Sequence, residues 1–599
     1  MKRLLVTTAL AETLDHSRSI VFLGEWCRLF RNREVLSATD NIVHPYHWDD
    51  RKKYRRDYIY LSELYEKKLL QLSKALGEMH GVSQEVRYWR IIVGPWLRFF
   101  SDAIYDRYEQ IRFLLDSGIA QDSVVMRYNM SDFVPFNFED FYSQFRVDDT
   151  WNHVVFAECL KEFGVLKLIE QGKISPQGKP LLNKRIPISA NKLIEYGCRC
   201  FPQALNRVVF VSSYISWYRL VRLQLELLQL PYLRAPILYS KRVQVDMEKR
   251  RSLVSGRSIG LFEAFLDRMI QQWIPLVYVE SFDSFRKMTL EQFPSSPEVI
   301  FTANAYQADD GFKIWAAHHV VERGVQLVIG QHGGNFGIAL FNQTEDHQIA
   351  IADVFASWGW SDSSRPTVQA LSAMKASGLG ARADVCGDIL LTAASLPRYF
   401  YCQYAIPIAG QSLRYLQDQI QFIEELSPEI RHLVHIRMDT DVFGWDLLAR
   451  LREAGIKGSI EEIKEPFGER LKRCRLHIAT TNTTVFLETL AANFPTLVFF
   501  DTELFEIRSQ ARDDIEALRS VSIFHDTPMA AAKFLNGIGN DISAWWNDYG
   551  VQQVRKEFCN RYARCSPDWA GEWKRLFRSL QVSANRADGF EPFGGGKVI

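Results

Sequence analysis

Residues 475–501 read RLHIATTNTTVFLETLAANFPTLVFFD and contain the pattern that decides the fold. An apolar run ends in the polar turn 480–484, a helical pattern of apolar residues follows directly, and a second apolar run closes the segment. Strand, helix and strand in this order form the repeating unit of a parallel sheet. Open sheets of this kind bind ligands beyond the carboxyl ends of their strands, so the turn is a candidate binding site.

The same alternation of short apolar runs and helical segments occurs in two parts of the chain. One series extends from residue 207 to residue 332, and the other extends from residue 353 to residue 501. Two such series predict an α/β fold with two Rossmann-like domains that face a cleft.

The domain boundaries follow from changes in composition. We place the N-terminal Rossmann-like domain at residues 1–340 and the C-terminal Rossmann-like domain at residues 341–525. Charged and aromatic residues at helical spacing predict a helical insertion in the first domain, at about residues 48–125. Residues 526–585 are expected to form C-terminal helices, and residues 586–599 a loose tail.

The charge and cysteine content narrow the class of protein. The chain has 599 residues and a formal net charge of +1, so no overall positive field attracts nucleic acid. Its nine cysteines show neither a disulfide framework nor a zinc pattern. No apolar window reaches the ~18 to 20 residues that a membrane span requires. We expect a cytoplasmic protein with no nucleic-acid partner.

Aromatic stretches of the helical insertion leave open a peripheral contact with the inner face of the membrane. They are YRRDY at residues 54–58 and WLRFF at residues 96–100. Aromatic residues on helices are more often part of the core, which is the competing interpretation.

The polar turn combines five short hydrogen-bonding side chains at the start of a predicted helix. They are Thr480, Thr481, Asn482, Thr483 and Thr484. Hydroxyl groups and free backbone N–H groups at a helix N-terminus bind phosphate well. Glu488 lies about one turn into the helix, where it could accept a hydrogen bond from a ribose hydroxyl. The alternative is an ordinary helix cap with a surface glutamate.

A histidine follows the apolar run in VQLVIGQHGGNFG, which begins at Val325. His332 is preceded by Gln331 and followed by Gly333 and Gly334, and glycine allows a ligand to approach the backbone closely. We expect this turn at the edge of the cleft. Gln331 and the two glycines would then contact the donor, the phosphate-bearing ligand that supplies the transferred group. The imidazole would then bind or protonate a leaving phosphate. The alternative is a histidine that satisfies a buried turn.

Three further charged residues are placed at the ends of predicted strands. Arg437 could pair with a donor phosphate, or else with a nearby aspartate at the surface. Glu25 and Glu280 are candidate catalytic carboxylates for the acceptor hydroxyl, either as a base or as a nucleophile. The sequence MDTD at residues 438–441 is the nearest approach to a magnesium motif, so we expect no metal and no cofactor.

The segment 475–501 resembles the donor-binding element of two-domain GT-B glycosyltransferases, with its strand, polar turn, helix with an internal glutamate and second strand. More narrowly, FLGEWCRL (22–29), IGQHGGNFG (329–337) and ATTNTTVFLETLA (479–491) together resemble a family of surface-carbohydrate transferases encoded in O-antigen loci. That family is similar to capsule-type transferases of 3-deoxy-octulosonic acid. The resemblance implies that the polar turn holds the nucleotide phosphates and that Glu488 reaches the ribose.

Residues and resemblance together predict a metal-independent glycosyltransferase. Its donor would be a nucleotide-activated sugar, with CMP-linked 3-deoxy-2-ulosonic acid as one candidate. Its acceptor would be a glycan or a lipid-linked glycan of the surface polysaccharide or lipopolysaccharide pathway. The alternatives left open are a CDP-polyol phosphotransferase, a nucleotide-sugar epimerase of the same fold, and a non-catalytic protein that binds a glycan or a nucleotide.

Overall fold

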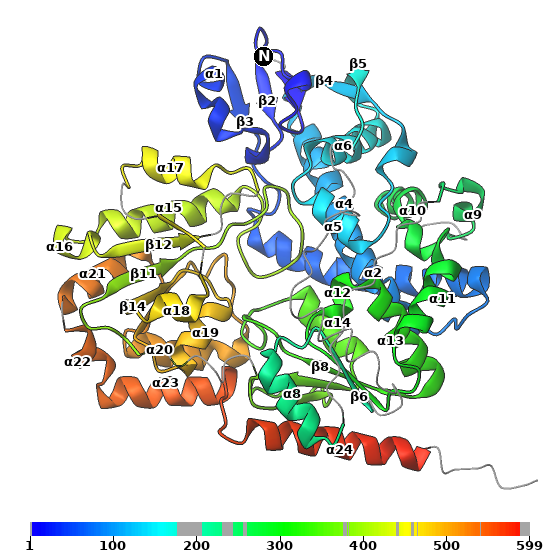
Figure 1. Cartoon of the computed structure of the whole chain (residues 1–599). Helices are drawn as coiled ribbons and strands as arrows, with labels where there is room; N and C mark the ends of the chain where they lie inside the picture. The colour runs from blue at the N-terminus through cyan, green and yellow to red at the C-terminus, as the bar shows by residue number, and fades with distance from the viewer. Residues whose placement is uncertain are drawn as a thin grey trace, which may run out of the picture.

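The computed structural model describes residues 3–176, 207–229, 243–254, 260–374, 380, 382–438, 443–456, 460–463, 465–539 and 541–587. Within these ranges the chain forms three parallel β-sheets with helices packed around them, which confirms the predicted α/β class (Figure 1). The close pair Cys198 and Cys200, most of the MDTD segment and most of the predicted tail lie outside the described residues.

The first sheet has the strand order β3-β2-β1-β4-β5. Its strands are β1 (Arg3–Val6), β2 (Ile20–Phe22), β3 (Asn41–Val43), β4 (Ala120–Arg127) and β5 (Lys167–Lys173). Its helices are α1 (Arg33–Ser37), α2 (Arg51–His80), α3 (Val86–Ile92), α4 (Gly94–Ser117), α5 (Phe138–Phe145) and α6 (Asp149–Phe163). The sheet lies at the top of Figure 1.

The predicted insertion consists mainly of α2, α3 and α4. The side chain of Asp50 caps the first turn of α2 by accepting from the backbone of Lys52 and Lys53. Gly118 ends α4 in the left-handed conformation, with a φ of 64°. The last residues of the predicted range then enter β4, which pairs with β1 and so belongs to the sheet.

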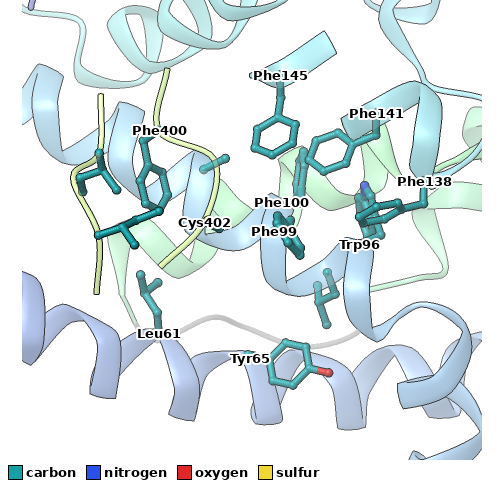
Figure 2. Packing of buried hydrophobic residues seen from close by; sticks show 14 of the residues in the cluster. Leu61, Tyr65, Trp96, Phe99, Phe100, Phe138, Phe141, Phe145, Phe400 and Cys402 are labelled. Atoms are coloured by element: carbon teal, nitrogen blue, oxygen red, sulfur yellow. The ribbon is translucent and has the colours of Figure 1, made fainter. Parts of the chain in front are cut away.

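The aromatic residues of WLRFF form core, which is the competing interpretation of this stretch. Trp96 and Phe100 of α4 are fully buried and stack at 4.8 Å between ring centroids. Phe141 of α5 packs against both rings (Figure 2). Among the described helices, none combines the length and the apolar content that a membrane span requires.

The middle sheet has the order β10-β9-β8-β7-β6. Its strands are β6 (Val208–Val211), β7 (Val299–Thr302), β8 (Gln326–Gly330), β9 (Val354–Ser357) and β10 (Val368–Ala370). Helices in this part are α8 (Trp217–Glu226), α9 (Met247–Arg251), α10 (Leu261–Trp273), α11 (Phe282–Gln292), α12 (Ala305–Ala308), α13 (Asp310–Arg323) and α14 (Gln343–Ile351). The run IPLVYVE, expected to be a strand, instead contains the short 3-10 helix η7 (Leu276–Tyr278).

The C-terminal sheet has the order β13-β12-β11-β14-β15-β16. Its strands are β11 (Asp388–Thr392), β12 (Val434–Met438), β13 (Ile460–Glu462), β14 (Cys474–Ala479), β15 (Thr496–Phe499) and β16 (Phe524–His525). Its helices are α15 (Gln411–Glu424), α16 (Pro428–Arg431), α17 (Leu447–Glu453), α18 (Phe467–Leu471), α19 (Thr484–Ala491) and α20 (Arg512–Ser520). The final helices are α21 (Pro528–Ile538), α22 (Ile542–Trp546), α23 (Tyr549–Tyr562) and α24 (Trp569–Ala587).

The middle and C-terminal sheets are the two predicted Rossmann-like units, and the first sheet is an additional unit within the predicted domain 1–340. Strands β9 and β10 follow residue 340 in sequence, yet β9 pairs with β8 and continues the middle sheet. The last helix, α24, also returns to this sheet, where Trp573 and Phe577 pack on Phe301 (Figure 1).

Candidate functional site

A cavity of about 410 Å³ lies where the middle and C-terminal sheets meet. One wall is the loop after β8, which contains His332, Gly333 and Gly334. The opposite wall is the turn before α19, with Thr481, Thr483 and Thr484. Two distant parts of the sequence, both singled out as binding turns, therefore line the same cavity.

His332 lies directly after β8 and is half-buried at the cavity wall. Its ring is 5.7 Å from the ring of Tyr214 and 5.6 Å from that of Phe336, measured between centroids. The contact with Phe336 is edge-to-face, at 87°. These aromatic neighbours hold the imidazole at the cavity.

Gly333 and Gly334 pack directly against the first residues of α19. The backbone N–H of Gly334 donates to Thr484 Oγ1 at 3.0 Å. A Cβ atom at Gly334 would lie 2.3 Å from the backbone of Thr483 and Thr484, and one at Gly333 would lie 2.6 Å from Thr484 Oγ1. Glycine is required here for close approach between the two halves, which places His332 beside the helix N-terminus.

The side chain of Gln331 fixes the conformation of the loop through three hydrogen bonds. Its Nε2 donates to the carbonyl of Gly333 at 2.9 Å, and its Oε1 accepts from Trp358 N and Trp360 Nε1, each at 2.9 Å. The side chain is buried and is not part of the cavity wall. Gln331 was expected at the donor; the structure instead shows that it fixes the backbone that carries His332.

Glu345 at the start of α14 fixes the far end of the same loop. Its carboxylate is 1% exposed and accepts from Gly337 N at 2.8 Å. Arg508, from the C-terminal half, donates to both oxygens of Glu345 and to the carbonyl of Ala339. The loop is therefore held to the C-terminal half at both ends, by Gly334 and by Glu345.

The predicted polar turn lies at the N-terminus of α19, and its side chains have different roles. Thr481 and Thr483 share a hydrogen bond of 2.8 Å at the cavity. Thr480 is buried behind them, donates to the carbonyl of Thr392 at 2.9 Å and bonds to Tyr415 Oη at 2.6 Å. Asn482 is fully buried, and neither amide atom has a hydrogen-bond partner among the described residues.

The first turn of α19 has no side-chain cap. Thr483 is the N-cap residue but makes no side-chain capping bond. The backbone N–H groups of the first turn of a helix have no partner within the helix, and the helix dipole favours an anion there. This end of α19 therefore has the chemistry of a phosphate site next to His332.

The two remaining residues expected at the donor lie outside the cavity wall. Glu488 is one turn into α19 and is buried. Arg437 ends β12, is buried, and donates to the carbonyl of Glu465 at 2.6 Å. Neither contributes to the described lining of the cavity.

The expected catalytic carboxylates lie away from the cavity. Glu280 forms a buried bidentate ion pair with Arg250, with distances of 2.6 and 2.9 Å. The strand end predicted for Glu280 was wrong, because the preceding residues turn into η7. Glu25 begins the 3-10 helix η2 (Glu25–Cys27) after β2 of the first sheet and lies 3.5 Å from Arg28. Neither glutamate lines the cavity.

The described lining has little formal charge. His332 contributes an imidazole, and none of the other described lining residues carries a carboxylate, an ammonium or a guanidinium group. Burial raises the pKa of Tyr401 and of Tyr404 well above the usual value of a phenol, so both remain neutral. Tyr404 Oη donates to Thr344 Oγ1 at 2.9 Å. The cavity therefore offers hydroxyl and amide groups around a single titratable imidazole.

Several lining residues were not singled out in the sequence. They include Tyr214, Gln307, Asn335, Tyr401 and Tyr404. The dense aromatic run YFYCQY at residues 399–404 was an available signal. It lies between β11 and α15 of the C-terminal unit, and only the packing of the two sheets brings it to the cavity of His332.

Comparison with known proteins identifies one matching family and several solved structures with low sequence identity to this chain. No protein with a curated function matches the chain. The wall teichoic acid polymerase TagF is 10% identical, with 65% of this chain and 92% of that chain covered and a TM-score of 0.30. The spinosyn rhamnosyltransferase SpnG is 12% identical, with 50% and 80% covered and a TM-score of 0.27. The trehalose-6-phosphate synthase OtsA is 9% identical, with 50% and 76% covered and a TM-score of 0.30.

A family model described as LIC12162 family transferase matches residues 3–577. This match includes all three sheets and both walls of the cavity. The chain therefore belongs to the LIC12162 family of transferases.

Proposed function

We propose that the chain transfers a glycosyl group from a nucleotide-activated sugar to an acceptor hydroxyl in the cavity between the middle and C-terminal sheets. The contact between Gly334 and Thr484 carries this proposal, because it brings the loop of His332 to a helix N-terminus that has no side-chain cap. A phosphate held at that terminus lies within reach of an acid–base group.

The donor phosphates bind at the first turn of α19, with Thr481 and Thr483 as hydroxyl donors. Asn482 is fully buried and lies outside the described lining, so its amide, which has no hydrogen-bond partner among the described residues, would reach a ligand only after a rearrangement. Glu488, one turn further along the helix, is proposed to accept from the ribose. Its carboxylate is buried on the same short helix as the phosphate site.

His332 is the residue that we expect to act on the charge or the proton released as the glycosyl group is transferred. The bond between the anomeric carbon and the phosphate oxygen breaks, and its electron pair remains on the phosphate. The acceptor oxygen bonds to the anomeric carbon and loses its proton. An imidazole at this position either stabilises the leaving phosphate by donating a hydrogen bond or removes the acceptor proton.

The lining also bears on the identity of the donor. CMP-linked 3-deoxy-2-ulosonic acid, implied by the resemblance, carries a carboxylate, and no lysine or arginine is among the described lining residues. This composition favours a neutral sugar. We propose a cell-surface glycan or its lipid-linked precursor as the acceptor, in the cytoplasm or at the inner face of the membrane.

A polyol phosphotransferase is the second candidate. The described lining holds a histidine and no carboxylate, and a histidine base is sufficient for attack of a hydroxyl on a phosphate. In that reaction the acceptor oxygen bonds to phosphorus and the nucleoside monophosphate leaves.

A thermal-shift screen with CMP, CDP, UDP and GDP tests the proposed donor site. A nucleotide that binds only the folded chain raises the melting temperature by mass action. We expect one nucleotide to stabilise the protein, and the identity of the best nucleotide then selects the activated donors for assay. Absence of any shift at millimolar nucleotide would contradict the proposal. Product analysis separates the candidates, because glycosyl transfer releases the nucleotide of the sugar donor and phosphotransfer leaves a phosphodiester on the acceptor.

A further inference from the structure

The cavity wall that contains His332 extends along the edge of the middle sheet, where three neighbouring strands end. Val211 of β6 pairs with Thr302 of β7, and Thr302 pairs with Ile329 of β8. The residues that follow these strands therefore emerge at one edge of the sheet. Tyr214 follows β6, Asn304 follows β7 and His332 follows β8.

Tyr214 is the aromatic residue that joins the cavity to the surface. It lines the cavity and is still 46% exposed. Its hydroxyl accepts from Asn304 Nδ2 at 3.0 Å, and its ring is inclined by 35° to that of His332. A sugar lying against this ring would have its hydroxyl groups next to the imidazole.

The backbone at this point is in an unfavourable conformation. Tyr214 has a φ of 57° and Ser212 a φ of 50°, in the left-handed region that glycine favours. Residues held in such conformations are concentrated at binding and catalytic sites, where the surrounding structure maintains them. The conformation turns the chain sharply after β6 and brings the Tyr214 ring to the cavity.

Two more exposed aromatic rings follow directly. Trp217 and Tyr218 begin α8, are 64% and 57% exposed, and meet edge-to-face at 6.3 Å between centroids. Arg219 lies 6.0 Å from the Tyr218 ring and 5.7 Å from the ring of Trp569, which begins α24. The contact with Trp569 attaches the start of α8 to α24, and the two helices lie side by side (Figure 1).

We propose that Tyr214, Trp217 and Tyr218 form a subsite that binds the saccharide of the acceptor. This inference rests on the proposed function and assigns its acceptor side. The donor phosphates occupy the α19 wall, so the acceptor approaches His332 from the Tyr214 wall. Apolar faces of sugar rings pack on aromatic rings, and sugar hydroxyls bond to planar amides such as those of Gln307 and Asn335 in the lining.

The hydroxyl and amide groups of the described lining residues fit an acceptor that is a neutral polyhydroxylated molecule. A lipid bilayer is the competing occupant of this surface, because Leu225 near the end of α8 and Leu228 just after it are 55% and 86% exposed. The continuity of Tyr214 with the cavity favours the saccharide. Binding to a bilayer would depend on Leu228 as much as on Trp217, whereas saccharide binding would not depend on Leu228. A substitution of Leu228 is therefore the control.

The test measures binding of the full chain to an array of bacterial surface oligosaccharides and, separately, to vesicles of phosphatidylethanolamine and phosphatidylglycerol. The variants are Trp217→Ala, Tyr218→Ala and the matched control Leu228→Ala. All three side chains are exposed, so the melting temperature should be unchanged. We expect the wild type to bind an oligosaccharide of the array, and each aromatic variant to bind it about tenfold more weakly. Leu228→Ala should bind it as the wild type does.

Equal oligosaccharide binding by all variants, or none by the wild type, overturns the acceptor subsite. Vesicle binding that is lost in Leu228→Ala and in Trp217→Ala alike also overturns it, in favour of a membrane contact. The nucleotide thermal shift, measured on the same preparations, keeps the two proposals distinguishable. A normal shift with no saccharide binding rejects the subsite alone, whereas saccharide binding with no nucleotide shift rejects the proposed donor site.

Discussion

The backbone N–H of Gly334, after the middle sheet, donates to the side chain of Thr484, at the start of a helix on the C-terminal sheet. These residues are 150 positions apart in sequence, and their contact forms the floor of the cavity between the two sheets. The hydrogen bond can form because neither Gly333 nor Gly334 has a side chain to separate the two halves.

Gly334→Ala should push the two walls of the cavity apart. The new methyl group would meet the backbone of Thr483 and Thr484, which cannot rotate away as a side chain can. We expect a loss of about 1 to 3 kcal/mol in the free energy of unfolding, as is usual for overpacking, together with loss of the nucleotide-induced thermal shift. Gly537→Ala in α21 is the control, since its methyl group would meet no atom within 4 Å. A tight nucleotide complex of Gly334→Ala would contradict this role.

Thr483→Val should weaken nucleotide binding and cost less stability than Thr480→Val, because it gives up only the part-buried hydrogen bond to Thr481. The hydroxyl of Thr483 faces the cavity, and a hydrogen bond to a charged phosphate contributes about 1.5 kcal/mol or more, which is about tenfold in Kd. Thr480→Val is the matched control, because that hydroxyl bonds to Thr392 and Tyr415 inside the protein. The control should lose about 1 kcal/mol of stability and bind nucleotide normally. The reverse pattern would move the donor site away from this turn. Calorimetric titration and thermal unfolding measure the two effects.

Glu280→Ala should affect folding and leave the chemistry unchanged. Removing one partner of a buried ion pair leaves Arg250 uncompensated, which costs about 3 to 5 kcal/mol. Glu25 is half-exposed, and its ion pair with Arg28, at 3.5 Å, is accessible to solvent. Glu25→Ala should therefore cost less than about 1 kcal/mol in the free energy of unfolding. Both variants should retain normal turnover per folded molecule. A folded Glu25→Ala protein without activity would restore a catalytic carboxylate to the mechanism.

Acid should destabilise the C-terminal sheet partly through His477. Burial on β14 lowers the pKa of His477 from 6.5 to about 3, and its ring nitrogens contact the hydroxyls of Thr392 and Thr489. Because the folded chain keeps this histidine neutral while the unfolded chain protonates it near pH 6.5, its contribution is complete above that pH. The contribution falls between about pH 6.5 and pH 3, by up to about 1.4 kcal/mol per pH unit. His477→Gln should flatten the melting temperature over this range, and an unchanged pH profile would contradict the assignment.

The binding turns could be predicted from local sequence because each depends on residues that are adjacent in the chain. The strand, polar turn and helix around residue 484 follow from the apolar pattern and the threonines, and the loop after β8 follows from His332 and its glycines. Their meeting in one cavity was inferred from the rule that ligands bind at the carboxyl ends of parallel strands.

The additional N-terminal sheet and the lining tyrosines could not be predicted in the same way. The strand that precedes Glu25 was expected, but its separate sheet was not, because β2 pairs with β1 and the three-residue strand β3 pairs with β2 only through tertiary contacts. Lys313 lies on a helix with charged neighbours in sequence, a pattern typical of a solvated face, but it is fully buried in an ion pair with Asp310 at 2.6 Å. Burial of this kind depends on elements that pack from distant parts of the chain.

His332→Ala tests the central claim most directly, with melting temperature and initial rate measured on one preparation and with the donor identified by the nucleotide screen. If the imidazole acts on the leaving phosphate or on the acceptor proton, turnover should fall by about 10² to 10⁴ while the melting temperature remains close to that of the wild type. A higher KM with an unchanged kcat would make His332 a ligand of the donor and not a catalyst. Normal turnover per folded molecule in His332→Ala would contradict the account.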